Sequence, residues 1–177
     1  MNKPTIIFEG LNCVGKSSLI KMLHEGEDIY IHNNRADFLN VNMADATYGY
    51  MKAFIDMLNF SKIPMWFDRF HFTEYAYGVV KRGYDEYTAS KVFAEVDYRL
   101  SEIGNVKLVY LYDSTVGIYK RTEELRGWGD IDTIKELNER IERCVDASCL
   151  SIMAFNYKEL IADEASMKKL ISFVKGE

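Results

Sequence analysis

The chain alternates between short apolar runs and longer segments in which apolar residues recur every three or four positions. The short runs predict strands over residues 5–8, 28–31, 63–68, 106–112 and 152–155. The longer segments predict helices over residues 16–25, 43–60, 71–83, 86–104, 115–125, 131–148 and 164–175. Because strands and helices alternate, we predict an α/β fold with a parallel sheet of about five strands covered by helices on both faces.

The turn after the first predicted strand carries a phosphate-binding pattern. It reads Gly10-Leu11-Asn12-Cys13-Val14-Gly15-Lys16-Ser17, which fits G-x-x-x-x-G-K-[ST], the P-loop. Glycines let the backbone turn its N–H groups toward an anion, while Lys16 would reach the outer phosphates and Ser17 would bind Mg²⁺. A strand precedes the loop and a helix follows it, which argues against a chance Gly-rich turn.

This pattern predicts a three-layer fold of the P-loop NTPase type, with ATP as phosphoryl donor and Mg²⁺ as metal. We assign the contacts to the loop and the first helical turn, namely Gly10, Asn12, Cys13, Val14, Gly15, Lys16, Ser17 and Ser18. Cys13 is either a small side chain in the loop, which is the simpler interpretation, or an oxidation-sensitive thiol.

The second informative segment is the apolar run that ends at Asp68. A run that is apolar on both faces is typical of a central parallel strand. In a P-loop fold such a strand ends beside the phosphate-binding loop, so we predict that Asp68 joins Ser17 at Mg²⁺. Arg69 follows at the carboxyl edge of the sheet, where open α/β sheets bind ligands.

Six aromatic residues lie close together here, namely Trp66, Phe67, Phe70, Phe72, Tyr75 and Tyr77. Core packing explains Trp66 and Phe67, whereas Phe70, Phe72 and Tyr77 either pack in the core or stack on a base. His71 is either a catalytic base or, as we favour, a capping or surface residue.

A basic segment interrupted by glycines predicts a lid over residues 120–131. Lys120, Arg121 and Arg126 flank Gly127 and Gly129. Closure of such a cover would exclude water and bring positive charge to the transferred group. We therefore predict catalytic roles for Arg121 and Arg126, with a solvated helix end as the alternative.

Composition and charge restrict the partners. The net charge is −5 and no long basic run occurs, which argues against nucleic acid as a partner. No apolar run approaches the ~20 residues of a membrane span, and the start of the chain leaves no room for a signal peptide.

The three cysteines match no zinc pattern and indicate a reducing compartment, the cytoplasm. A length of 177 residues predicts a single domain over 1–177.

Two segments of the sequence resemble those of a known family. Residues 8–18, Phe8-Glu9-Gly10-Leu11-Asn12-Cys13-Val14-Gly15-Lys16-Ser17-Ser18, resemble the opening of thymidylate kinases and their relatives, the deoxynucleoside kinases. Asp68-Arg69-Phe70, with Thr73 and Ala76-Tyr77, is similar to a segment of thymidylate kinases. The resemblance implies that Lys16 and Ser17 hold ATP and Mg²⁺. It also implies an acceptor site with a phosphate on Arg69, further contacts from Phe70, Thr73 and Tyr77, and a homodimer packed through helices.

The chain departs from that family at three places. Asn12 stands where an Asp usually contacts the acceptor's sugar, and Gly78 stands where a Gln is usual. The usual Arg-Glu-Pro after the second strand is missing, and only Arg35 lies nearby, either as a cation of the site or in a solvated connection. A divergent member of the family would show such differences. If that member were viral, it would act in the cytoplasm of the host cell.

The chemistry of the acceptor separates two classes of kinase. A nucleoside hydroxyl benefits from a carboxylate base, which deoxynucleoside kinases place just after the second strand, but here no acid precedes Asp37. A monophosphate instead needs cations, which Arg35, Arg69 and the lid would supply. We therefore predict a (deoxy)nucleoside monophosphate kinase acting on nucleotide substrates. A nucleoside or other small-molecule kinase and a non-catalytic nucleotide-binding module are the alternatives.

Overall fold

A five-stranded sheet forms the centre of the molecule. The structure is a computed structural model that describes residues 3–24, 29–32, 43–60, 63–126 and 130–177, with the backbone alone for 32, 43–47 and 122–126. The strands are β1 (Thr5–Glu9), β2 (Ile29–His32), β3 (Met65–Asp68), β4 (Val106–Tyr112) and β5 (Ser151–Asn156). All neighbours in the order β2-β3-β1-β4-β5 pair in parallel, which confirms the predicted sheet.

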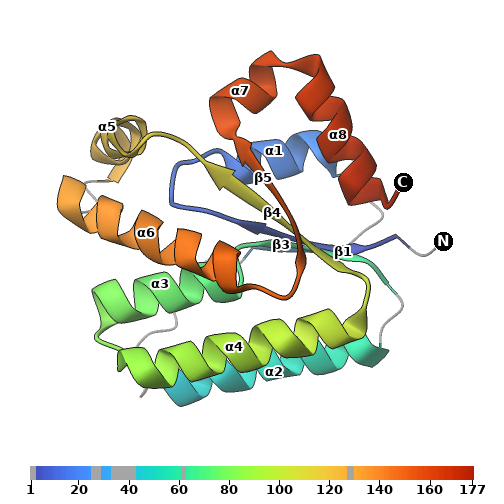
Figure 1. Cartoon of the computed structure of the whole chain (residues 1–177), viewed down its shortest axis with the longest axis vertical. Helices are drawn as coiled ribbons and strands as arrows, with labels where there is room; N and C mark the ends of the chain where they lie inside the picture. The colour runs from blue at the N-terminus through green and yellow to red at the C-terminus, as the bar shows by residue number, and fades with distance from the viewer. Residues whose placement is uncertain (1–2, 25–28, 33–42, 61–62, 127–129) are drawn as a thin grey trace.

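Helices cover both faces of this sheet (Figure 1). They are α1 (Lys16–Leu23), α2 (Met43–Phe60), α3 (His71–Arg82), α4 (Glu86–Ile103), α5 (Thr115–Arg126), α6 (Ile131–Ala147), α7 (Tyr157–Ala162) and α8 (Glu164–Lys175). In Figure 1, α1, α7 and α8 lie on one side of the sheet, and α2, α3, α4 and α6 lie on the other. The result is the three-layer α/β sandwich that the sequence predicts. No helix in the described ranges is both long and apolar enough to cross a membrane.

The core lies around β1, whose five residues are all buried. Covering both faces of the sheet removes the alternation of apolar and polar positions that a half-exposed strand would show. Phe8 stacks on Trp66 of β3, with ring centroids 5.5 Å apart, and Phe67 is buried against Phe54 and Phe70. Trp66 and Phe67 are therefore core residues, as expected.

The prediction missed one helix, α7. It follows β5 directly, where Asn156 caps it by accepting hydrogen bonds from the N–H groups of Lys158 and Glu159. Six residues are too few to show helical periodicity, so no element was predicted between residues 155 and 164. The ends of the other helices and strands lie within about two residues of the predicted ends, which is the usual uncertainty of such boundaries.

The topology brings two informative segments together. Phe8 of β1 is in register with Asp68 of β3, so both strands end at the same edge of the sheet. The loop after β1 and the Asp68-Arg69 pair after β3 therefore share the crevice where open α/β sheets bind ligands.

Candidate active site

Two glycines shape the loop between β1 and α1. Gly10 and Gly15 have φ angles of 137° and 108°, which disfavour other residues. A Cβ at position 10 would overlap the carbonyl oxygen of Leu111, and one at position 15 would overlap the ring of Tyr157. Gly15 also leaves the first turn of α1 without a side-chain cap. The helix N-terminus therefore keeps N–H groups to offer an anion.

Lys16 lies folded against its own loop. Its side chain donates hydrogen bonds to the carbonyl oxygens of Gly10 and Leu11 at 2.7 and 2.6 Å, and only 3% of the residue is exposed. Burial, reinforced by the positive charge of Arg69, lowers the pKa of Lys16 to about 7, against the opposing effect of Asp68. The ammonium is therefore held in place by carbonyls that a polyphosphate could replace as partner.

Ser17 and Asp68 meet across the crevice. The Ser17 hydroxyl donates to Oδ2 of Asp68 at 2.5 Å, and the Tyr30 hydroxyl reaches the same oxygen at 3.4 Å. Burial together with Asp68 raises the pKa of Tyr30 to about 12, so Tyr30 keeps its proton. A hydroxyl and a carboxylate are hard oxygen ligands that suit Mg²⁺, which usually takes its other ligands from phosphates and water. The described residues contain no cluster of three or more acidic, His or Cys side chains, and a nucleotide-dependent metal needs none.

Arg69 adopts an unusual backbone conformation beside this pair. Its φ angle is 74°, in the left-handed region that non-Gly residues adopt at a cost of about 1–2 kcal/mol. Its N–H donates to the carbonyl of Phe8 at 2.9 Å. The side-chain Nε is buried and has no hydrogen-bond partner among the described residues. A buried unpaired donor of this kind calls for a bound acceptor.

Glu9 fixes the segment that follows Arg69, a role that the sequence analysis missed. This fully buried carboxylate accepts from the N–H groups of Phe70, Phe72 and Thr73 at 2.8–3.2 Å, and from the Thr73 hydroxyl. It thus supplies the negative charge that a helix N-terminus favours, at the start of α3. The one available signal was an acid placed between an apolar strand and the first glycine of the loop. Thr73, predicted to contact the acceptor, has its hydroxyl on Glu9.

Two other predicted acceptor contacts lie in the protein interior. Phe70 is buried between Phe54 and Phe67, with ring centroids at 6.3 and 5.0 Å. The hydroxyl of buried Tyr77 accepts from the N–H of Asn12 at 3.3 Å and links α3 to the loop. Oδ1 of Asn12 is itself buried without a partner among the described residues. The loop therefore holds one buried acceptor, Oδ1 of Asn12, beside the contact that joins it to α3.

Arg121 lies against the phosphate-binding loop. It donates from Nε to the carbonyl of Cys13 at 2.9 Å and from Nη2 to Asp113 at 2.8 Å. It is thus anchored at the loop by the end of β4, a contact that the sequence did not predict. Arg35, residues 127–129 and the side chain of Arg126 lie outside the described residues. Val14 is buried, and Ser18 is exposed at the start of α1.

His71 is neither on the surface nor at the crevice, contrary to the favoured expectation. Only 1% of it is exposed, and its Nε2 lies 2.9 Å from Oδ1 of Asp97. The two residues are 26 positions apart, so no local pattern indicated the pair.

The fold and this site define the class. A phosphate-binding loop after β1, an acid after β3 and a parallel sheet between two helical layers make up the P-loop NTPase type of α/β fold.

Comparisons with known proteins support this class at the level of the fold. No family model and no curated protein matches the chain. Among solved structures, the YorR protein from Bacillus subtilis, in complex with phosphorylated GDP, has a TM-score of 0.74 at 17% identity and covers 96% of this chain and 95% of its own. A gluconokinase from Sinorhizobium meliloti 1021 has a TM-score of 0.55 at 14% identity, and the match covers 98% of this chain and 96% of the gluconokinase. Deoxyadenosine kinase from M. mycoides with bound dCTP has a TM-score of 0.57 at 14% identity, and the match covers 95% of this chain and 99% of the kinase.

Proposed function

We propose that the chain transfers the γ-phosphoryl group of ATP to the phosphate of a nucleoside or deoxynucleoside monophosphate. The observation that carries this proposal is the buried, unpartnered Nε of Arg69 beside the phosphate-binding loop. A guanidinium in that place suits an anionic acceptor, because it pairs with phosphate oxygens. The two solved structures named as kinases share the fold, and the ligand of a third is a nucleotide.

The chain's own residues provide positioning and charge. The N–H groups of the loop and Lys16 would hold the β- and γ-phosphates of ATP, and Arg69 would hold the acceptor phosphate in line with them. An acceptor oxygen then bonds to the γ-phosphorus as the bond to the bridging oxygen breaks and ADP leaves. Ser17 and Asp68 would hold Mg²⁺, which neutralises charge on the phosphates when bound. Arg121, tied to the Cys13 carbonyl, would keep the loop in shape.

A kinase for a hydroxyl acceptor is the second candidate, because two of the similar structures are a gluconokinase and a deoxyadenosine kinase. Such an acceptor benefits from a carboxylate base. Of the carboxylates at this edge of the sheet that the structure describes, Glu9 is occupied by α3, Asp68 by Ser17, and Asp113 by Arg121. The described site therefore favours the monophosphate. The homodimer and the cytoplasmic compartment stay predictions.

A coupled assay of ADP production decides between these candidates. Purified protein, Mg²⁺ and ATP are combined with each nucleoside, its monophosphate and gluconate. We expect turnover with monophosphates only. Turnover restricted to hydroxyl acceptors would replace the proposal by the second candidate. ATP binding with no acceptor-dependent ADP would indicate a non-catalytic module.

Nucleotide binding should depend on pH through Lys16. With its pKa near 7 in the free protein, Lys16 loses its proton as the pH rises above 7, whereas a bound polyphosphate stabilises the charged form. The affinity for Mg-ATP should therefore fall between pH 7 and 9, by up to roughly tenfold per pH unit, and binding should take up protons. Calorimetry in buffers of different ionisation heat measures both effects. A constant affinity over this range would contradict the prediction; Lys16→Arg, which stays charged, provides the reference.

A further inference from the structure

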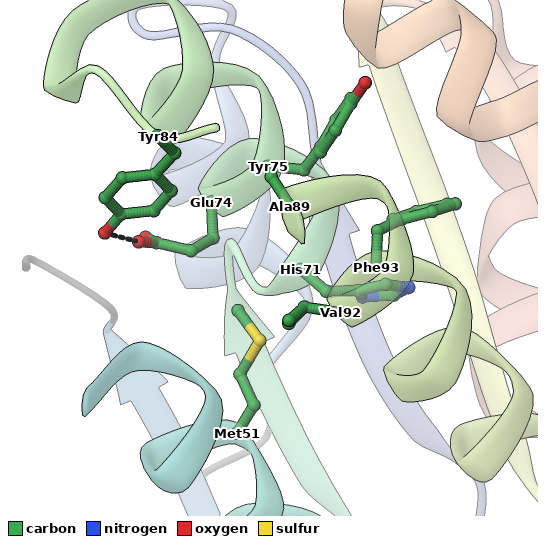
Figure 2. Close-up of a pocket in the computed structure, with 8 residues that line it drawn as sticks. All are labelled: Met51, His71, Glu74, Tyr75, Tyr84, Ala89, Val92 and Phe93. Carbon is green, nitrogen blue, oxygen red and sulfur yellow. Dashed lines mark hydrogen bonds between the residues drawn. The ribbon is translucent and has the colours of Figure 1, made fainter. Parts of the chain in front are cut away.

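A small pocket lies between α2, α3 and α4 (Figure 2). Its apolar walls include Met51, Ala89 and Val92, and its polar members are His71, Glu74, Tyr75 and Tyr84. The free volume of about 20 Å³ suffices for a group of the size of a water molecule. The pocket thus fits the edge of a larger ligand, not a whole ring.

His71 lines this pocket and has one ring nitrogen engaged by Asp97. Asp97 accepts hydrogen bonds from the Ser148 hydroxyl and the Cys149 N–H as well as meeting Nε2 of His71. Because a carboxylate only accepts, Nε2 carries a hydrogen, and a ring with a single proton keeps Nδ1 as an acceptor. This Nδ1 is buried and has no partner within the described ranges.

Glu74 gives the pocket a second accepting group. The residue is 6% exposed and accepts hydrogen bonds from the Arg82 guanidinium and, at 3.2 Å, from the Tyr84 hydroxyl (Figure 2). The Tyr84 proton is therefore directed to the carboxylate. Glu74 and the singly protonated ring of His71 both offer acceptors, so the ligand group that matches these two residues is one that donates hydrogen bonds from nitrogen.

The pocket begins close in the chain to the proposed phosphate contact. His71, the first residue of α3, follows Arg69 by two residues, and Glu74 lies in the first turn of the same helix. Arg82, the partner of Glu74, is the last residue of α3, and Tyr77 of the same helix contacts the loop at Asn12.

The ring of Tyr84 also limits which residues of α3 can contact a ligand in this pocket. A Cβ at Gly78 would overlap this ring, so position 78 offers no side chain and the ring forms the wall. Recognition then falls to Glu74 and His71.

We propose that this pocket receives the amino-bearing edge of the acceptor's base, which makes guanine, adenine or cytosine nucleotides the substrates and excludes thymine and uracil nucleotides. The inference rests on the proposed function. An exocyclic amino group is small enough for the pocket and donates the N–H bonds that its acceptors require.

Matched pairs of nucleotides test the proposal. GMP and IMP differ by one amino group, and CMP carries an amino group where UMP has an oxygen. We expect kcat/KM and equilibrium binding in the presence of Mg-ADP to favour GMP and CMP at least tenfold over their partners. Glu74→Gln, which replaces an accepting oxygen by a donating group, should reduce this ratio to near one. Glu164→Gln, at an exposed site on α8, should leave it unchanged.

Ala89→Leu provides a second variant that removes no buried charge. The larger side chain should fill the pocket and weaken GMP binding at least tenfold, while Mg-ATP binding stays the same. Equal handling of GMP and IMP by the wild type would overturn the pocket assignment and leave the kinase proposal intact, as would discrimination that survives in Glu74→Gln. If Mg-ATP binds and no monophosphate binds or reacts, both proposals fail.

Discussion

Lys16→Ala should reduce phosphoryl transfer by roughly 10²–10³ or more, the cost of removing one preorganised donor from a reacting centre. Lys16 is the buried cation of the loop, already held by the carbonyls of Gly10 and Leu11. In the variant, the charge that develops on the transferred group would lose the ammonium that the loop supplies. ADP production at saturating ATP and acceptor measures the loss.

The same variant should fold normally. Lys16 is held in a buried environment that lowers its pKa, so its charged form is disfavoured in the native state and its removal costs little stability. Chemical denaturation should give a free energy of unfolding no lower than that of the wild type. Lys21→Ala, on the exposed side of α1, controls for the loss of a positive charge from that helix. A fully active Lys16→Ala protein would remove the loop from the proposed reaction.

The sequence indicated the parts of the site that are local in the chain or fixed by topology. The phosphate-binding loop is a contiguous pattern with a strand before it and a helix after it, and these elements are present as expected. Placing Asp68 beside Ser17 needed only the rule that adjacent parallel strands end at one edge, and the structure brings the two side chains together. Their roles in metal binding stay predictions.

The contacts that the sequence could not indicate join residues far apart in the chain. Glu9 meets the start of α3 across more than 60 positions, and Arg121 meets Cys13 across 108. Neither hydrophobic periodicity nor motif spacing encodes such pairs, because they depend on how packed elements orient individual side chains. The buried pair of His71 and Asp97 has the same origin, which is why a surface position was expected for His71.

These distant contacts explain how Arg69 is held in its strained conformation. The N–H of Arg69 donates to the carbonyl of Phe8, and Glu9 accepts from the N–H groups of Phe70, Phe72 and Thr73 that follow. One strand end thus fixes both sides of the arginine. Strain that the surrounding structure maintains at a crevice is typical of a preorganised ligand contact.

Arg69→Ala should therefore lower kcat/KM for the acceptor by roughly 10²–10³, which corresponds to one charge-assisted contact on the reacting group. The affinity for Mg-ATP should change little, because the loop and Lys16 hold the donor. Arg69→Lys should recover part of the loss, since it keeps the charge but not the planar fork. Steady-state kinetics with varied acceptor, together with calorimetric titration of Mg-ATP, separates the two effects.

Stability measurements on a third variant test the backbone argument independently of any substrate. Arg69→Gly accepts a φ of 74° without strain, so it should be more stable to denaturant than Arg69→Ala by about 1 kcal/mol, although both lack the guanidinium and should be equally poor enzymes. Arg99→Ala, which removes a half-buried arginine paired with Glu95 on α4, should match the wild type in acceptor kinetics. Acceptor kinetics of Arg69→Ala equal to those of the wild type would contradict the proposed role of Arg69, because its buried Nε would then have no anion to meet.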